Sequence, residues 1–245
     1  EVDAHFAHGK VTNWFGGSSN ASTELLDVMH YRGLLRVARR EGGTRVYAVR
    51  ETAAVPEAEP DAGIATSRMD ALVDVLVHKY APLSASTLGQ LVGHLRGGAP
   101  QWTAHRGAAL ARAKQRLAHV RVEGIDWYWP AADVPPSVRW RPDESVRLLT
   151  PFDPIVWDRR RFEIFWGWAY RFEAYVPAPK RKLGYYALPL LWHERVIGWG
   201  NVTASDGRLR CAFGYTSGRA PRDAAFRAGL EAELARMRGF LGLPG

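Results

Sequence analysis

Cysteine is nearly absent from this sequence: Cys211 is the only one among 245 residues. A single thiol cannot form an internal disulfide, and it cannot supply the paired thiolates of a structural zinc site. Disulfide-stabilised secreted domains and centres built on paired cysteines are therefore excluded. A cytoplasmic, nucleoid-associated setting fits this composition better than a secreted one.

Long apolar runs are absent as well. No segment approaches the roughly 18 to 20 apolar residues of a membrane helix, and the N-terminal "EVDAHFAHGK" has no apolar stretch of the kind found in signal peptides. We therefore expect a soluble protein that does not associate with membranes. The chain also begins at Glu1 and not at methionine, and we expect an upstream segment to be missing.

Metal-binding and phosphate-binding patterns are also missing. The eight histidines show no ligand spacing beyond the isolated pair His5 and His8. The glycine pairs at 16–17 and 97–98 are typical of turns and not of a phosphate-binding loop. We predict no metal site, and we expect each histidine to be a surface or helix-packing residue.

Positive charge is what the sequence has in excess. Its 33 Lys and Arg residues outnumber 25 Asp and Glu residues, which gives a formal charge of +8 and a pI near 9.9. This balance favours a polyanionic partner, with nucleic acid first and an anionic membrane surface second. The alternative is that a GC-rich genome has raised the arginine and alanine content without a functional reason.

Residues 18–49 predict a helix followed by a two-stranded ribbon. The polar "SSNAST" suits a helix start, "ELLDVMHYRGLL" has apolar residues at helical spacing, and "RVARREGGTRVYAV" alternates around Gly42-Gly43. A Gly-Gly pair inside alternating residues indicates a hairpin turn. Helix and ribbon are the second half of a winged helix, so we expect an incomplete one over 1–52, without its first helix.

The same order recurs downstream with all of its helices. Residues 67–81, 84–95 and 103–118 have helical apolar spacing, and "HVRVEGIDWYWP" alternates around a turn at 123–124. We expect a complete winged helix over 67–131. Pro-rich linkers are expected before it at 53–66 and after it at 132–146.

Aromatic residues concentrate in the last part of the chain, where we expect a β-rich domain over 147–245. Strands are predicted in "FEAYV", "YYALPLLW", "RVIGWGNVTA" and "RLRCAFGY". One stripe of a terminal helix contains Phe226, Leu230, Leu234 and Leu241. The predicted fold class is α+β, with tandem winged-helix units followed by a small antiparallel sheet or barrel and a C-terminal helix.

The segment "YVPAPKRKLGYYALPLL", residues 175–191, is expected to be a hairpin with three consecutive cations at its tip. Pro177 and Pro179 fix φ near about −65° and withhold backbone donors, which stiffens the loop and protects its edge from pairing. The cations at 180–182 would then form a rigid projection that meets a DNA groove or its phosphates. The alternative is an edge-protected hairpin without a binding role.

Winged helices that bind DNA place the third helix in a groove and the wing against phosphate. The expected DNA-contacting residues are cations of the two wing units, of the arginine cluster after Asp158 and of the proline-containing loop: Arg36, Arg39, Arg40, Arg45, Arg106, Arg112, Lys114, Arg116, Arg159, Arg160, Arg161, Lys180, Arg181 and Lys182. The alternative is that these cations form solvated faces, or that the wings contact other proteins.

Residues 148–199, "LLTPFDPIVWDRRRFEIFWGWAYRFEAYVPAPKRKLGYYALPLLWHERVIGW", resemble the YcaQ/AlkZ family of bacterial DNA glycosylases. The resemblance is almost continuous in "PFDPIVWDR", "YVPAPKR" and "LPLL", and the two wing units upstream are similar in order and spacing. It implies tandem winged helices and a β-rich domain that grip double-stranded DNA, alkylated or crosslinked DNA included, as a monomer. It also implies excision of N7-alkylated purines and unhooking of interstrand crosslinks without a cofactor.

The family's catalytic side chains lie in a short motif of Gln, an apolar residue, and then Gln or Asp. None of the three glutamines, Gln90, Gln101 and Gln115, is followed by such residues. We therefore predict no catalytic residue, and we expect an N-terminally truncated chain without the catalytic winged helix. Asp153 or Asp158 could serve as a general base, but helix capping explains both at lower cost.

Three functions are consistent with these patterns. The first is the DNA-binding portion of a crosslink-repair glycosylase. The second is a non-catalytic winged-helix DNA-binding protein or regulator, and the third is a scaffold that uses its wings for protein contacts. Binding to duplex DNA, and its dependence on salt, would distinguish among them.

Overall fold

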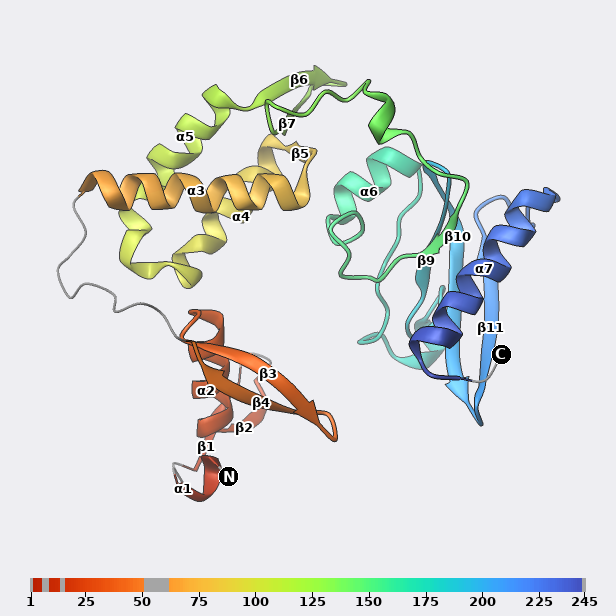
Figure 1. Cartoon of the computed structure of the whole chain (residues 1–245), viewed down its shortest axis with the longest axis horizontal. Coiled ribbons are helices and arrows are strands. Elements are labelled where there is room, and N and C mark those ends of the chain that lie inside the picture. Colours follow the sequence, from red (N-terminus) through yellow and green to blue (C-terminus); the bar gives the residue numbers. More distant parts are fainter. Residues whose placement is uncertain (1, 6–8, 14–15, 51–61, 244–245) are drawn as a thin grey trace. The chain divides into compact units, whose positions relative to one another are not determined.

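The computed structural model describes residues 2–5, 9–13, 16–50 and 62–243 (Figure 1). Helices and small antiparallel sheets make up this part of the chain, which confirms the predicted α+β class. The chain divides into an N-terminal unit of residues 1–78 and 85–128 and a C-terminal unit of residues 79–84 and 129–245. Each helix in the described ranges is too short or too polar to cross a bilayer.

The N-terminal unit begins with a short helix, a small sheet, a longer helix and a hairpin. These elements are α1 (Val2–His5), β1 (Lys10–Thr12), β2 (Ser18–Asn20), α2 (Ala21–Tyr31), β3 (Leu35–Glu41) and β4 (Thr44–Val49). The helix and hairpin predicted over 18–49 are present. Both turn residues, Gly42 and Gly43, have positive φ (54° and 84°), which explains why glycine occupies both positions.

The segment of residues 62–129 is mainly helical, with a small sheet in the strand order β5-β7-β6. Its elements are α3 (Ala62–Tyr80), β5 (Leu83–Ser84), α4 (Ala85–Gly98), the 3-10 helix η1 (Pro100–His105), α5 (Arg106–Arg116), β6 (Ala118–Val122) and β7 (Ile125–Trp129). Three helices are again found where the sequence predicts them, although α3 begins earlier, at Ala62. Of the predicted linker at 53–66, residues 53–61 lie outside the described ranges, as does His8.

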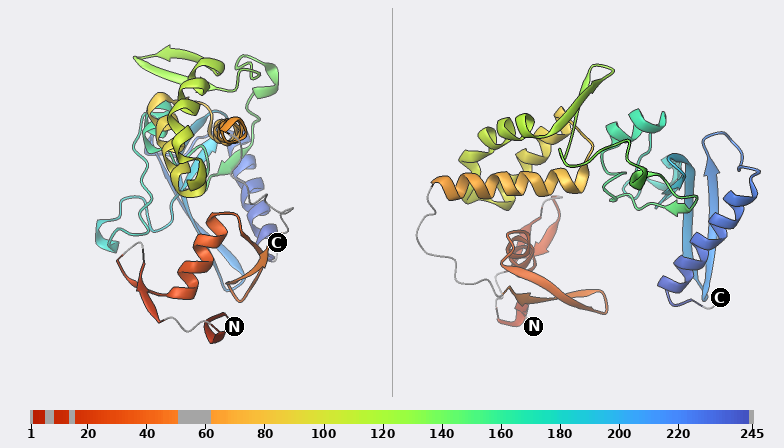
Figure 2. Two further views of the ribbon diagram at one scale, coloured as in Figure 1. Left: turned by 90° about the vertical axis from the view of Figure 1, so that its left-hand side faces the viewer. Right: turned by 45° about the horizontal axis from the view of Figure 1, so that its top comes forward.

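Apolar residues at helical spacing hold this helical part together. Ala65, Met69, Val73 and Val77 follow one another every four residues on α3, and all are buried. Leu88 and Val92 of α4 and Ala109 and Ala113 of α5 are buried as well. Figure 2 shows α3, α4 and α5 packed side by side.

The C-terminal unit is an open antiparallel sheet in the strand order β11-β10-β9-β8. Its elements are η2 (Val138–Trp140), β8 (Val146–Leu148), α6 (Arg159–Trp166), η3 (Ala178–Lys180), β9 (Leu188–Trp192), β10 (Arg195–Ser205), β11 (Arg208–Tyr215) and α7 (Ala224–Phe240). The terminal helix α7 covers the sheet, as predicted (Figures 1 and 2). Phe226 is buried on α7, whereas Leu241 lies beyond its last turn and is exposed.

Two apolar clusters form the core of this unit. In the first, Val146, Leu190 and Phe226 join the sheet to α7. In the second, Phe162 of α6 packs with Val156, Tyr170 and Val196. Trp166 and Trp168 meet Phe162 edge to face, with ring centres 4.6 and 5.2 Å away.

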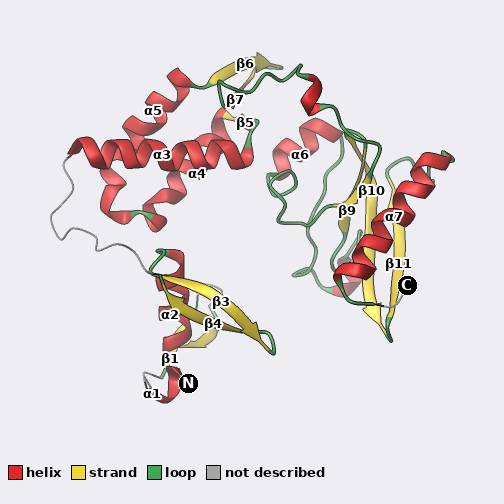
Figure 3. Ribbon diagram, in the orientation of Figure 1, coloured by secondary structure: helices red, strands yellow, loops and turns green. Residues whose placement is uncertain are grey.

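Three predictions for this unit are wrong. "FEAYV", residues 172–176, is not a strand, and the long connection between α6 and β9 is irregular except for η3, as the green trace in Figure 3 shows. Residues 175–191 therefore do not form a hairpin. Asp153 does not start a helix: its Oδ1 accepts a hydrogen bond from the N–H of Ile155 at 2.8 Å within a turn, and α6 begins only at Arg159.

Candidate nucleic-acid interface

The β3–β4 hairpin carries four of the predicted DNA contacts, and all four are exposed: Arg36, Arg39, Arg40 and Arg45. The strands pair in antiparallel register with an irregularity between Val37 and Arg39, beyond which Arg40 lies opposite Arg45. Like charges directly opposite each other repel. The tip of this hairpin therefore favours an anionic partner.

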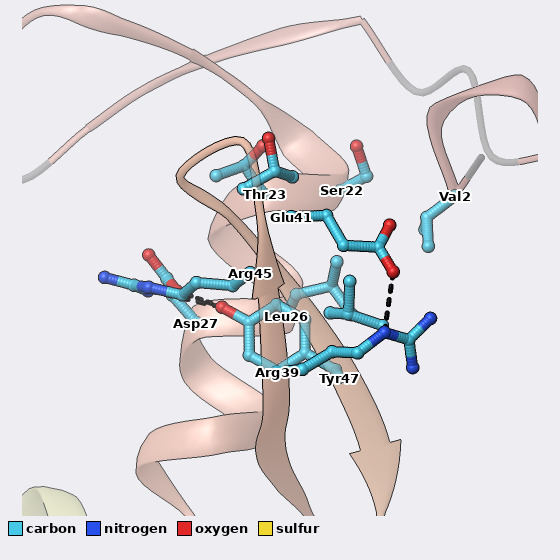
Figure 4. A pocket seen from close by; sticks show the side chains of 11 residues that line it. Val2, Ser22, Thr23, Leu26, Asp27, Arg39, Glu41, Arg45 and Tyr47 are labelled. Atoms are coloured by element: carbon cyan, nitrogen blue, oxygen red, sulfur yellow. Dashed lines mark hydrogen bonds and ion pairs between the residues drawn. The ribbon is translucent and has the colours of Figure 1, made fainter. Parts of the chain in front are cut away.

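Acidic residues partly neutralise two of these arginines. Arg39 forms an ion pair with Glu41 at 2.6 Å, and Arg45 forms one with Asp27 at 2.5 Å. The Tyr47 hydroxyl also donates to Asp27, at 2.8 Å. These groups line an open concavity of about 810 Å³ between α2 and the hairpin (Figure 4). Because its charges are paired with one another, this concavity is a weak site for an added anion.

The arginines of α5 are used inside the N-terminal unit. Arg112 forms two hydrogen bonds to the Asp70 carboxylate, both at 2.8 Å, and Arg116 forms an ion pair with Asp74 at 2.5 Å. The hydrogen bonds that Arg112 donates to Asp70 raise the pKa of Arg112 above its ordinary value. These pairs tie α5 to α3, so any contact of Arg112 or Arg116 with phosphate competes with an internal partner.

The other two predicted DNA contacts of α5, Arg106 and Lys114, are also less available to a ligand. Arg106 donates to the backbone carbonyls of Gly93, at 2.9 Å, and Thr103, at 3.2 Å. Lys114 is half-buried. The cations of this helix are consequently weaker candidates for DNA contact than those of the hairpin.

Three consecutive arginines open α6, and the structure separates their environments. Asp158 caps the helix as predicted, because its Oδ1 accepts from the N–H of Arg161 at 3.0 Å. Arg159 and Arg160 are exposed, whereas Arg161 is only 4% exposed. The first two can therefore reach a ligand.

The prediction that Arg161 contacts DNA is wrong. Its guanidinium donates to the backbone carbonyl oxygens of Tyr80, Pro82 and Pro154. Burial lowers the pKa of Arg161, while the charges of Asp158 and Asp153 act in the opposite direction. Because the side chain is buried and its two terminal nitrogens bind carbonyl oxygens, Arg161 is not accessible to a phosphate.

A buried carboxylate organises the connection between α6 and β9. Glu173 is 7% exposed, and its Oε2 accepts from the N–H groups of Lys182, Leu183 and Gly184 at 2.9, 2.7 and 3.2 Å. Burial acts to raise the pKa of Glu173, but the hydrogen bonds from Leu183, Lys182 and Gly184 outweigh it and leave the pKa below its ordinary value of 4.5. Glu173 is therefore an ionised internal anchor at neutral pH.

Two further side chains brace residues 173–186, the segment we call the anchored loop. Arg181 Nε donates to the Val176 carbonyl at 2.8 Å, and its guanidinium lies 4.9 Å from the ring centre of Tyr185. Asn201 Nδ2 donates to the Leu183 carbonyl at 2.7 Å. Arg181 thus has a structural contact within the loop, whereas the side chains of Lys180 and Lys182 on either side of it are exposed.

The anchored loop is the site that sequence reasoning identified only in part. The cations and prolines were visible in the sequence, but Glu173 and Asn201 were missed. No local pattern marks a carboxylate whose partners lie up to 11 residues further along the chain. The Glu173 hydrogen bonds thus fix part of the loop that follows Pro177 and Pro179.

The carboxylates considered as catalytic bases have local structural partners. Asp153 accepts from Ile155 N–H and Asp158 from Arg161 N–H, as described above. In the described part of the chain, no three or more His, Cys, Asp and Glu residues are grouped so that they could hold a metal ion. The exposed cations of this region are candidates for binding an anionic partner.

The chain matches a known family over almost its whole length. The family model described as DNA glycosylase AlkZ-like covers residues 1–240. No solved structure matches the chain.

Proposed function

The chain belongs to the AlkZ-like family of DNA glycosylases, and we propose that it supplies the DNA-binding portion of an enzyme that removes N7-alkylated purines and unhooks interstrand crosslinks. Duplex DNA is its partner. The observation that carries this proposal, together with family membership, is the anchored loop, where buried Glu173 fixes the backbone that presents Lys180 and Lys182 to solvent.

Six cations are the proposed phosphate contacts. They are exposed and make no ion pair with a described acidic residue: Arg36, Arg40, Arg159, Arg160, Lys180 and Lys182. Exposed cations gain free energy from DNA by releasing its condensed counterions. A cation that already has a carboxylate partner gains less, because it must give up that partner.

The helix-and-hairpin segments are the proposed winged helices. In this proposal α2 with β3 and β4 forms the end of one, and α3, α4 and α5 with β6 and β7 form another. The tip of the first hairpin, where Arg40 lies opposite Arg45, would act as a wing on the phosphate backbone.

The chemistry requires little from the protein as a proton donor. Alkylation at N7 places positive charge on the purine, so the base can leave without a strong general acid, and a positioned water then captures the sugar cation. We assign no residue of this chain to that step. None of its three glutamines is part of the family's catalytic motif, and Asp153 and Asp158 already accept backbone hydrogen bonds.

A salt titration tests the DNA-binding proposal. Affinity of the chain for a labelled duplex is measured by fluorescence anisotropy at several salt concentrations. About six phosphate contacts predict a slope of log K against log salt of about −5. Affinity that does not change with salt would contradict binding through phosphates, and no binding at low salt would favour the scaffold alternative.

Base release separates a glycosylase from a DNA-binding regulator. The chain, and a version extended upstream to include the family's motif, are each incubated with DNA that contains N7-methylguanine. We expect release by the extended protein and none by this chain. If neither releases the base while both bind duplex DNA, the regulator reading is correct and the enzymatic part of the proposal is wrong.

A further inference from the structure

Four aromatic rings meet at the base of the anchored loop. Phe172 is the centre of this ring cluster, and it meets Phe152, Tyr175 and Tyr186 with ring centres 5.3, 6.1 and 5.1 Å away. All three contacts are edge to face, with interplanar angles of 66°, 84° and 88°. The cluster therefore presents ring faces and edges in several directions instead of one flat stack.

Most of this aromatic surface faces solvent. Tyr175 is 83% exposed, Phe152 is 68% exposed and Tyr186 is 41% exposed. Large aromatic side chains that gather on a surface without a cover indicate a binding site more often than isolated exposed ones do. Phe152 and Tyr175 belong to neither of the two core clusters of this unit. Packing of the core therefore does not explain why aromatic residues occupy these positions.

The cluster sits on a backbone that is fixed in advance. Tyr175 and Tyr186 lie within the anchored loop, which Glu173, Arg181 and Asn201 brace by the hydrogen bonds described above. The hydroxyl of buried Tyr170 donates to the carbonyl of Ala187 at 2.8 Å, directly after Tyr186. The entropy cost of ordering these rings when a ligand stacks on them would consequently be small.

Positive charge lies beside the rings. Lys180 and Lys182 are exposed in the same loop as Tyr175 and Tyr186. Alternation of exposed aromatic rings and cations is the pattern that binds an unpaired nucleic-acid strand, in which bases stack on rings while phosphates meet cations.

We propose that the ring cluster of Phe152, Phe172, Tyr175 and Tyr186 binds unpaired DNA bases by stacking, with Lys180 and Lys182 on the adjoining phosphates. This inference rests on the proposed function, which it extends from duplex binding to the recognition of bases that have left the stack. Both the charge and the ring faces fit DNA better than an apolar protein surface, for which the cations would have to be desolvated.

Three probes test the inference with the whole chain. They are a fully paired duplex, the same duplex with one bulged 2-aminopurine, and an oligothymidine single strand. We expect the bulged duplex to bind about tenfold more tightly than the paired one, since each base that stacks on a ring contributes a factor of roughly this size. We also expect 2-aminopurine fluorescence to fall on binding, because stacking quenches it.

Substitutions in the cluster assign the effect to its rings. Tyr175→Ala and Phe152→Ala should abolish both the preference and the quenching, whereas Tyr175→Phe keeps the ring and should preserve them. Phe240→Ala is the matched control, because Phe240 is 89% exposed on α7 outside the cluster. All four substitutions are at exposed positions, and circular dichroism would verify that each variant is folded.

The outcomes separate this inference from the proposed function. Salt-dependent binding with equal affinity for the paired and bulged duplexes would overturn the inference and leave the proposed function intact. Binding of oligothymidine without duplex binding would support the inference and overturn duplex binding. No binding to any of the three probes would overturn both.

Discussion

The Glu173 carboxylate accepts a hydrogen bond at 2.7 Å from the backbone N–H of Leu183, ten residues further along the chain. The N–H groups on either side of Leu183 bind the same oxygen atom. One side chain thus replaces the strand pairing that the sequence pattern predicted for this segment. The carboxylate satisfies the backbone N–H groups of the anchored loop, as a neighbouring strand would do in a sheet.

Replacing Glu173 with glutamine should destabilise the anchored loop. The amide keeps one oxygen but loses the charge that strengthens hydrogen bonds from three N–H groups, which are contributed by Lys182, Leu183 and Gly184. We expect the free energy of unfolding to fall by about 1–3 kcal/mol, as measured by urea denaturation. Glu163→Gln, at an exposed position, is the control and should change it little. Equal stability of the two variants would show that Glu173 is not an anchor.

The same carboxylate gives stability a defined dependence on pH. Its folded pKa lies below the ordinary value of 4.5, so the unfolded chain takes up a proton first as the pH falls. The stabilisation is complete above about pH 5 and decreases as the pH falls toward the folded pKa. The difference in unfolding free energy between the natural protein and Glu173→Gln should therefore be constant near neutrality and shrink below about pH 5. A difference that grows on acidification would contradict this sign.

Substitution of two adjacent arginines on α6 should affect different properties: stability for Arg161 and DNA binding for Arg160. Arg161→Met leaves three backbone carbonyls without their donor and should lower the unfolding free energy by about 3 kcal/mol. Arg160→Met, at an exposed position, should leave stability unchanged and weaken DNA binding. Thermal unfolding and duplex titration of both variants would check this. A stable Arg161→Met protein with impaired DNA binding would reverse the assignment.

The exposed lysines of the anchored loop should act on DNA through charge alone. Lys180→Ala combined with Lys182→Ala removes two phosphate contacts and should reduce the magnitude of the salt slope by about 2, with no change in thermal stability. Arg181→Ala should instead lower stability, because Arg181 bonds to the Val176 carbonyl and covers Tyr185. An unchanged salt slope in the double variant would show that Lys180 and Lys182 do not contact phosphate and that the loop has only a structural role.

Gly184 should not tolerate a side chain. A Cβ atom there would lie 2.2 Å from Asn201 Oδ1, and the φ of 123° is unfavourable for other residues. We expect Gly184→Ala to cost about 2 kcal/mol or more of unfolding free energy. Gly93→Ala is the contrast: it lies inside α4 with nothing within 4 Å of the added atom, and should stabilise by about 0.5–1 kcal/mol. Denaturation midpoints of both variants would settle the comparison.

Sequence reasoning succeeded where local pattern and structure coincide. The helical spacing of Met69, Val73 and Val77 predicted α3, and the Gly42-Gly43 turn predicted the β3–β4 hairpin, because each depends on neighbours in the sequence. The α+β class followed from the same signals. The winged-helix arrangement and the domain limits remain predictions.

Sequence reasoning failed where a distant group determines the conformation. "FEAYV" alternates like a strand, but Glu173 within it turns inward to bind backbone amides and leaves no sheet partner for the segment. Arg161 was grouped with Arg159 and Arg160 because the three are adjacent, yet one turn of helix directs Arg161 to carbonyls up to 81 residues away in sequence. Neither the Glu173 contacts nor the Arg161 contacts can be predicted from residue spacing.

The three carbonyls bound by Arg161 restrict which segments of this chain can be exchanged by recombination. Tyr80 and Pro82 belong to the C-terminal unit although more than forty residues of the N-terminal unit, 85–128, separate them from the rest of it. A recombination event that joined residues 129–245 to a different gene would transfer Arg161 without Tyr80 and Pro82, which provide two of its three acceptors. We therefore expect natural rearrangements in this family to keep the end of α3, which provides Tyr80, together with residues 129–245.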